Sequence, residues 1–144
     1  MKIERATLKN AYTLAVLTQR FFPYTGIGYP QVVERLNNPE IEYYVALEGN
    51  STVGFTDVEA KPDGQAKVLG LAVLPENRRK GYGSALLDKA LERAIARGAK
   101  KCTVLVAEDN AVAQKIYESR GFASAGTLDY KLWDKTVLLM SKQF

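Results

Sequence analysis

The residues best placed to do chemistry lie in a basic, glycine-rich segment at residues 78–84. This segment, Arg-Arg-Lys-Gly-Tyr-Gly-Ser, follows an apolar run at residues 66–74 and opens an amphipathic stretch at residues 82–97. The free N–H groups of a helix's first turn and the helix dipole attract anions. Because Gly81 and Gly83 carry no Cβ, a phosphate group can approach the backbone closely. The segment therefore predicts a phosphate or pyrophosphate site at a strand-to-helix turn.

Two widespread phosphate-binding motifs do not fit this segment. The P-loop needs Gly-Lys-Ser/Thr after a four-residue gap from an earlier glycine, and that pattern is absent. The dinucleotide fingerprint needs a glycine or alanine where Leu86 stands, and it follows the first strand of its fold. Here the turn follows the fourth expected strand. A plain helix start, with no ligand, is the alternative interpretation.

The composition excludes several classes of enzyme. The 144 residues include no histidine and one cysteine, Cys102. Without histidine, a Ser-His-Asp triad, a Cys-His dyad and a histidine-ligated zinc site cannot form. A single cysteine also excludes an intramolecular disulfide and a multi-cysteine metal site, so we expect no metal. Cys102 lies in an apolar strand, where we expect it to be buried packing rather than an acyl-carrying thiol.

Positive charge is concentrated in one part of the chain. The net charge is +4, and residues 78–101 hold eight basic side chains against two acidic ones. Such a patch suits a phosphate-bearing partner, although a solvated helix face has the same composition. Nucleic-acid binding is therefore one hypothesis for function. It is disfavoured because only Tyr82 interleaves with these cations for base stacking.

The sequence also bears on location and domain organisation. Its longest apolar run, residues 68–74, is far shorter than the ~20 residues that a membrane-spanning helix needs. Residues 1–5 do not begin an apolar segment of the signal-peptide type. We therefore expect no membrane association, a cytoplasmic location and one domain across residues 1–144.

Hydrophobic periodicity predicts the order β-α-α-β-β-β-α-β-α-β-β. The expected strands are residues 3–8, 43–47, 52–59, 66–74, 102–106, 125–133 and 136–141, and the expected helices are residues 11–20, 30–36, 82–97 and 110–121. A helix between the fourth and fifth strands makes those two parallel neighbours, whereas the hairpins make the others antiparallel. The sequence thus predicts an α/β protein of the α+β type, with a mixed, mostly antiparallel sheet of about seven strands and four helices on both faces.

Four stretches of the sequence, taken in order along the chain, form a recognisable pattern. The loop has the pattern Arg78-x-x-Gly81-x-Gly83, and a later stretch has the pattern Asn110-x-x-Ala113-x-x-x-Tyr117-x-x-x-Gly121-Phe122. The strand at residues 69–75 precedes the loop, and the apolar residues 137–142 come last. Together these stretches resemble the GCN5-related N-acetyltransferases (GNAT family). The resemblance runs from about residue 7 to residue 142 and is most specific at residues 69–122.

The resemblance implies a single-domain GNAT fold whose parallel fourth and fifth strands splay apart. It implies acetyl-CoA as the donor and a primary amine as the acceptor: a small molecule, a peptide, or a protein N-terminus or lysine. It leaves open the amine, the length of the acyl group and whether the chain forms a homodimer. A non-catalytic acyl-CoA sensor of the same fold is the alternative function.

The resemblance also implies the coenzyme-binding residues. They are Leu71, Ala72, Val73, Arg78, Arg79, Lys80, Gly81, Tyr82, Gly83, Ser84, Asn110 and Tyr117. The amides from Arg79 to Ser84 would hold the pyrophosphate. Leu71 and Val73 would pair with the pantetheine arm as an extra strand, and an N–H near Val73 would stabilise the oxyanion. Asn110 would contact the arm across the cleft, or serve only as a helix cap.

By the same resemblance, Tyr117 is the general acid that protonates the departing thiolate, with a core aromatic as the alternative. The general base is less well defined. Some members carry a glutamate on the fifth strand, and Leu105 stands at that position here. Asp57 and Glu59 on the third strand are the expected substitutes, acting through a water chain, and Glu76 is a third candidate.

Half of the 14 aromatic side chains precede residue 45. They are Tyr12, Phe21, Phe22, Tyr24, Tyr29, Tyr43 and Tyr44. We expect some of them to line an acceptor site, with Glu34, Glu40 or Glu42 attracting the charge of the amine.

Overall fold

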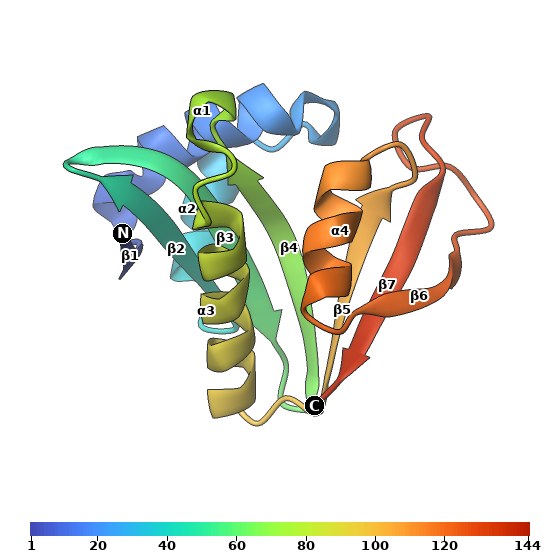
Figure 1. The fold of residues 1–144 in the computed structure, drawn as a ribbon. Helices are drawn as coiled ribbons and strands as arrows, with labels where there is room; N and C mark the ends of the chain where they lie inside the picture. Colours follow the sequence, from blue (N-terminus) through green and yellow to red (C-terminus); the bar gives the residue numbers. More distant parts are fainter.

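Seven strands form one mixed sheet in the computed structural model, which describes residues 1–144 (Figure 1). They are β1 (Lys2–Arg5), β2 (Ile41–Glu48), β3 (Ser51–Ala60), β4 (Gln65–Val73), β5 (Lys101–Ala107), β6 (Ala123–Thr127) and β7 (Val137–Gln143). Their order across the sheet is β1-β2-β3-β4-β5-β7-β6, and only β4 and β5 run parallel. The predicted fold class and the parallel central pair are both confirmed.

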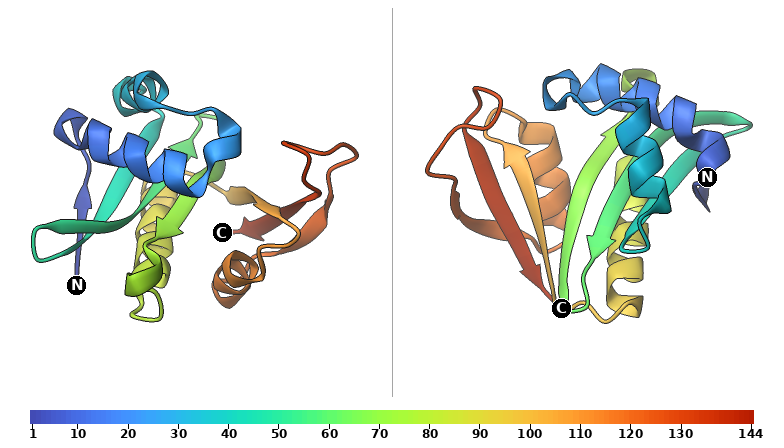
Figure 2. Two further views of the ribbon diagram at one scale, coloured as in Figure 1. Left: turned by 90° about the horizontal axis from the view of Figure 1, so that it is seen from above. Right: turned by 180° about the vertical axis from the view of Figure 1, so that it is seen from behind.

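Four helices cover the two faces of the sheet. They are α1 (Ala11–Phe21), α2 (Tyr29–Asn37), α3 (Tyr82–Ala96) and α4 (Ala111–Ser119), with short 3-10 turns η1 (Leu8–Asn10), η2 (Pro23–Thr25) and η3 (Pro75–Asn77). Helices α1 and α2 lie on one face, and α3 and α4 lie on the other (Figure 2). No helix combines the length and the apolar character needed to cross a membrane.

Most element boundaries follow local signals. Strand β4 ends at Val73, two residues before Pro75, which has no N–H for a ladder. Helix α3 is followed by Gly98 with φ of 88°, a left-handed stop that glycine adopts without strain. Asn10 directly precedes α1, but its side chain does not cap that helix. Its Oδ1 instead accepts a hydrogen bond from the Thr7 N–H at 2.9 Å, closing the turn before the helix.

The strand expected at residues 125–133 is wrong in extent, because β6 ends at Thr127. Farther along, Leu132 and Lys135 exchange two backbone hydrogen bonds of 3.1 and 2.8 Å. The two residues between them, Trp133 and Asp134, have φ of 52° and 62°. Two left-handed residues make a tight reverse turn of the kind that usually contains Asn-Gly. The pair Trp133-Asp134 lacks the glycine that usually marks such a turn, so the sequence pattern did not reveal it.

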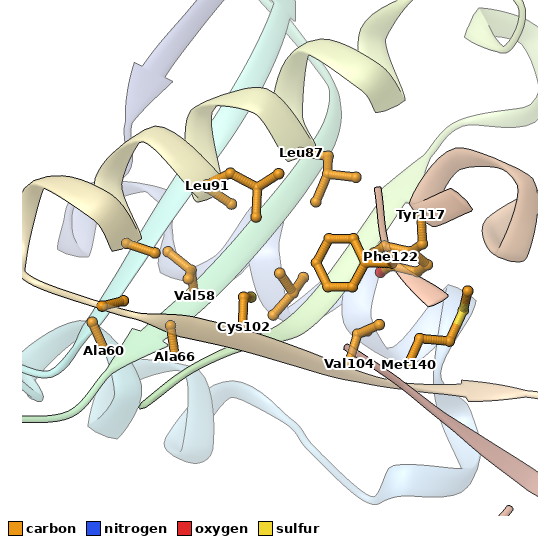
Figure 3. Packing of buried hydrophobic residues seen from close by; sticks show 14 of the residues in the cluster. Val58, Ala60, Ala66, Leu87, Leu91, Cys102, Val104, Tyr117, Phe122 and Met140 are labelled. Atoms are coloured by element: carbon orange, nitrogen blue, oxygen red, sulfur yellow. The ribbon is translucent and has the colours of Figure 1, made fainter. Parts of the chain in front are cut away.

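The largest apolar cluster lies between the sheet and the helices α3 and α4 (Figure 3). Leu87 and Leu91 of α3 pack here, and Tyr117 of α4 meets Phe122 with ring centroids 5.5 Å apart. Cys102 belongs to this cluster and is fully buried, as expected. Burial raises the pKa of its thiol to about 12, so the thiol stays protonated at neutral pH and serves as packing.

Strands β4 and β5 pair over only part of their length. Residues 65–68 pair with residues 101–104, and beyond this point the two strands diverge (Figure 1). A bulge accompanies the divergence: on β3, Asp57 opposes Gly70 and Val58 opposes Val68, which leaves Leu69 as an extra residue of β4. Bulges bend a strand and increase its twist. The splayed pair expected from the resemblance is therefore present.

Candidate active site

The loop that joins β4 to α3 has the backbone shape of an anion site. Arg79 has φ of 64° and Gly81 has φ of 87°, both in the left-handed region. Left-handed residues next to right-handed ones let successive N–H groups converge on one point. Helix α3 begins directly afterwards, so its positive dipole end adds to them. Arg79 and Gly81 are exposed to solvent, as a ligand-binding loop requires.

A carboxylate at the end of β2 anchors this loop. Glu48 Oε2 accepts hydrogen bonds from the Tyr82 hydroxyl at 2.9 Å and from Asn77 Nδ2 at 3.1 Å, and Lys80 Nζ lies 3.6 Å away. The Tyr82 side chain is buried by this contact, which leaves only its backbone for a ligand. Sequence reasoning did not identify Glu48 or Asn77, because 29 residues separate them and neither lies in the glycine pattern.

Arg78 is turned back onto the protein. Its Nε donates to the Val73 carbonyl at 3.2 Å, and its guanidinium lies 6.0 Å from the centre of the Phe21 ring. The expectation for Val73 therefore needs a correction: its carbonyl already has a donor, so its N–H is the group left for a ligand. The Arg78 side chain secures the end of β4, while the amides that follow it remain free to face an anion.

The edge of β4 that faces β5 is open where the strands splay. The Leu74 N–H bonds to the Val53 carbonyl at 2.8 Å. Because bonded and non-bonded pairs alternate along an antiparallel ladder, Val73 and Leu71 direct their backbone groups away from β3 and towards the gap. Ala72 points its side chain into the cluster beneath α1. The structure thus brings the Leu71 and Val73 edge to the gap, as expected.

Helices α3 and α4 meet at the same gap. A Cβ on Gly83 would lie 3.3 Å from Ile116 Cδ1 and 3.8 Å from Val73 Cγ2, so glycine lets α3 begin this close to α4 and β4 without a shift of Ile116. Ser84 is half-buried in the same turn. Asn110 is exposed, and its Oδ1 accepts from the Ala113 N–H at 3.1 Å. The helix-cap role of Asn110 is thus present.

Tyr117 is 4% exposed within the large apolar cluster. Its hydroxyl makes no hydrogen bond, yet every fully enclosed polar side-chain atom of the chain has a partner. The hydroxyl therefore reaches open space at the edge of the cluster. Burial raises the pKa of Tyr117, and the charges of Cys102 and Asp57 add to that rise. Tyr117 is therefore a packed aromatic whose hydroxyl stays protonated at neutral pH, because its pKa is raised.

A cavity of about 340 Å³ lies on the opposite face of the sheet. It is walled by α1, η2, α2, the splayed strands and the turn at residues 132–135. Of the seven aromatic residues before residue 45, three line the cavity: Phe22, Tyr24 and Tyr43. The others, Tyr12 and Tyr29 among them, do not. Leu105, at the position of the missing glutamate, also lines it.

Asp57 is the only carboxylate among the lining residues of this cavity. It is 1% exposed, and its Oδ2 accepts from Arg35 Nη1 at 2.9 Å. Burial raises the pKa of Asp57 to about 6, although Arg35 and Tyr43 both act to lower it. A Cβ on Gly70 would lie 2.8 Å from Asp57 Oδ1, so glycine at this position lets the carboxyl lie directly against β4. Nothing in the sequence pattern had singled out Gly70 or Arg35.

The other candidate carboxylates lie elsewhere. Glu59 is half-exposed, opposite Ile41 and Lys67 in the sheet, and does not line the cavity. Glu76 is exposed in η3. Neither is brought to Asp57, which is left as the one candidate base at the cavity.

Glu34, Glu40 and Glu42, which were expected to attract the amine, also do not line the cavity. Glu42 lies on the α3 face, where it accepts from Arg93 Nε at 2.9 Å and from the Tyr44 hydroxyl at 2.6 Å. Its burial would raise the pKa of the carboxyl, but these hydrogen bonds hold the pKa at about 2. Arg97 lies 3.5 Å from the same carboxylate. Two of the cations in the basic segment are therefore occupied in tying α3 to β2 rather than free for nucleic acid.

Comparisons with known proteins give one family. The sequence profile of the acetyltransferase (GNAT) family matches residues 10–122. An acetyltransferase of Yersinia pestis (strain Pestoides F) is 27% identical over 96 residues, which cover 67% of this chain and 68% of that protein.

Two solved structures have a similar fold. Ard1 from Thermoplasma volcanium has a TM-score of 0.85 at 22% identity, covering 99% of this chain and 96% of that chain. The PaiA N-acetyltransferase from Thermoplasma acidophilum, solved in complex with coenzyme A, has a TM-score of 0.83 at 20% identity and full coverage of both chains. At these identities the likeness shows a shared fold.

The buried pair of Arg35 and Asp57 generates a prediction on stability. We expect Arg35→Gln to lower the free energy of unfolding by about 3 kcal/mol at pH 8, because an ionised buried carboxylate loses its partner. At pH 5, below the pKa of about 6, the carboxyl is protonated in the folded protein and needs no partner, so the loss shrinks. Urea unfolding at both pH values measures this difference.

Arg120→Gln is the matched control, because it removes the same charge from a more exposed pair with Asp88. We expect a loss of less than about 1 kcal/mol at either pH. An equal loss for Arg35→Gln at pH 5 and pH 8 would show that Arg35 acts through packing alone.

Proposed function

Because this chain belongs to the GNAT family of acetyltransferases, we propose that it transfers the acetyl group of acetyl-CoA to a primary amine held in the cavity beside Asp57. Residues 1–144 act in this proposal as one catalytic unit. The observation that carries it is the gap between β4 and β5. Tyr117 approaches this gap from the α4 side and Asp57 from the α1 side, close enough for the Asp57 charge to raise the pKa of Tyr117.

The loop after β4 holds the donor in this proposal. Amides from Arg79 to Ser84 bind the pyrophosphate, and the exposed edge of β4 at Leu71 and Val73 pairs with the pantetheine arm. The PaiA enzyme, which shares the fold, was solved in complex with coenzyme A, and this supports a coenzyme A thioester as the donor. A thioester extended along the gap would then lie between the hydroxyl of Tyr117 and the carboxyl of Asp57.

Asp57 is the proposed base. An alkylammonium ion has a pKa near ~10 and must lose a proton before its nitrogen can attack. A carboxylate with a pKa of about 6 is ionised at neutral pH and is more basic than an ordinary aspartate. Arg35 holds one oxygen of Asp57 and so keeps the carboxylate ionised despite its burial. Asp57 accepts the proton, directly or through one water molecule.

The negative charges that develop on the thioester oxygen and on the departing sulfur are stabilised by Val73 and Tyr117 in this proposal. The amine nitrogen forms a bond to the thioester carbon, and the Val73 N–H stabilises the negative oxygen that results. When the carbon–sulfur bond breaks, Tyr117 donates its proton to the departing thiolate. The raised pKa of Tyr117 keeps the hydroxyl protonated at neutral pH until that moment. The nitrogen then loses its second proton, which reprotonates Tyr117 through water, and the proton on Asp57 returns to solvent.

Gly83→Val tests the placement of the donor. A branched side chain at the mouth of the loop should weaken acetyl-CoA binding by about tenfold or more, because it fills the space between α3, Ile116 and Val73. Titration calorimetry measures the affinity. Glu92→Val introduces the same side chain on an exposed face of the same helix and should leave the affinity unchanged. Equal affinity for both variants, each shown to be folded, would contradict the assigned loop.

Tyr117→Phe tests the general acid. We expect kcat to fall by about 10²-fold, with the affinity for acetyl-CoA nearly intact, because only a proton donor is removed. Thiol release under saturating acceptor measures kcat, and calorimetry measures the affinity. Tyr130→Phe removes an exposed hydroxyl as a control. An unchanged kcat in the Tyr117 variant would assign this residue to packing.

The pH profile tests the base. Below pH 6 Asp57 is protonated and cannot accept a proton, so kcat/KM should rise with pH through an apparent pKa near 6. Asp57→Asn should lack this rise and lose about 10²-fold in kcat/KM at neutral pH. Glu59→Gln should keep the rise, because Glu59 does not line the cavity. A rise near pH 6 that survives in Asp57→Asn would exclude Asp57 as the base.

A further inference from the structure

The cavity beside the gap carries unbalanced positive charge. Its charged lining residues are Arg35, Asp57, Lys67 and Lys135. Arg35 and Asp57 neutralise each other at 2.9 Å. Lys67 forms no ion pair, and Lys135 lies 3.8 Å from the exposed carboxylate of Asp109. The lining residues thus include one engaged carboxylate and one lysine with no ion pair, and Glu59, which stands opposite that lysine on β3, does not line the cavity.

Lys67 lines the cavity at some distance along β4 from Asp57, the proposed base. It precedes Gly70 by three residues on β4, and Gly70 is the residue against which the Asp57 carboxyl packs. Three residues of strand span roughly 10 Å, which the bulge and the flexible lysine side chain shorten. A small molecule with one end at Asp57 therefore reaches Lys67 with its other end.

An aromatic contact limits the cavity on its outer side. The rings of Tyr24 in η2 and Trp133 in the turn at residues 132–135 lie 5.1 Å apart, and Lys135 Nζ lies 5.3 Å from the centre of the Tyr24 ring. These contacts connect the two segments that flank the cavity. Trp133 holds a left-handed backbone that a large side chain adopts at a cost. This strained turn places the indole in the wall of the cavity.

We propose that the acceptor is a small amine that also carries a carboxylate, with the amine at Asp57 and the carboxylate at Lys67. This inference rests on the proposed function. A volume of about 340 Å³ suits such a molecule, and the lysine supplies the charge that the carboxylate needs. A diamine or polyamine would place a second positive charge against Lys67 and Lys135, where like charges repel. A protein N-terminus or lysine would require the contact between Tyr24 and Trp133 to open.

Matched acceptors test the proposal on the wild-type protein. The series consists of ω-amino acids from glycine to 6-aminohexanoate, each compared with its amide and with the diamine of the same chain length. Phenylalanine, phenylalaninamide and a tetrapeptide complete it. Thiol release from acetyl-CoA gives kcat/KM for each. We expect one or more of the amino acids to exceed the matched amide by about tenfold or more, and the diamine by a larger factor.

Lys67→Gln should reduce the preference for the carboxylate over the amide to about twofold while the amide itself is used as before. Lys61→Gln, an exposed lysine outside the cavity, should leave the preference unchanged. An altered rate for the amide with an unaltered preference would assign Lys67 a purely structural role and overturn the proposal.

The remaining outcomes are separable from a failure of the proposed function. Turnover that favours the diamines, the amides or the tetrapeptide overturns the acceptor class but leaves the acetyltransferase activity in place. Binding of acetyl-CoA with turnover of other amines but of no amino acid also overturns the acceptor class, whereas binding with no turnover of any amine would contradict the proposed function and point to the acyl-CoA sensor. Absence of acetyl-CoA binding in calorimetry would likewise contradict the proposed function itself.

Discussion

The incomplete pairing of β4 and β5 is the constraint on which the rest of the site depends. The two strands share a ladder only over residues 65–68 and 101–104, after which each leaves an edge of unsatisfied backbone groups. An open edge inside a sheet is costly unless something pairs with it. The bulge at Leu69 lies where this opening begins, and Gly70 beside it lets the Asp57 carboxyl lie against β4. One irregularity thus accompanies both the opening of the sheet and the placement of the candidate base.

The protein keeps that opening rigid by fixing what surrounds it. Arg78 of the loop donates to the Val73 carbonyl, and the Tyr82 hydroxyl donates to Glu48 outside the loop, so side-chain hydrogen bonds hold both ends of the glycine-rich loop. Across the gap, Gly83 allows α3 to begin within van der Waals reach of Ile116 in α4. Because the side chains of Arg78 and Tyr82 already have partners within the protein, they do not cover the backbone amides of the loop.

Charge is distributed differently on the two faces of the sheet. On the α3 face, the buried Glu42 is surrounded by Arg93, Arg97 and Arg5, and its pKa falls to about 2. On the α1 face, the buried Asp57 has one cationic partner, and its pKa rises to about 6. Both carboxylates lie on strands of one sheet, and the deeper burial of Asp57, together with the fewer cations around it, separates their pKa values. Only the more deeply buried carboxylate titrates near neutral pH.

Local patterns determined much of this protein. Periodicity and glycine and proline positions predicted the order of all eleven main elements, and the loop at residues 78–84 was singled out from its own composition, because an anion site of this kind is built from backbone groups of adjacent residues. The tertiary structure decided what depends on distant contacts. It brought Arg35 to Asp57, Glu48 to Tyr82 and Tyr24 to Trp133, and it left Glu59 outside the cavity. Alternation along a strand predicts which face of the sheet a side chain lies on. Its contact partner, however, comes from a distant segment, so the spacing of residues within one strand does not predict that partner.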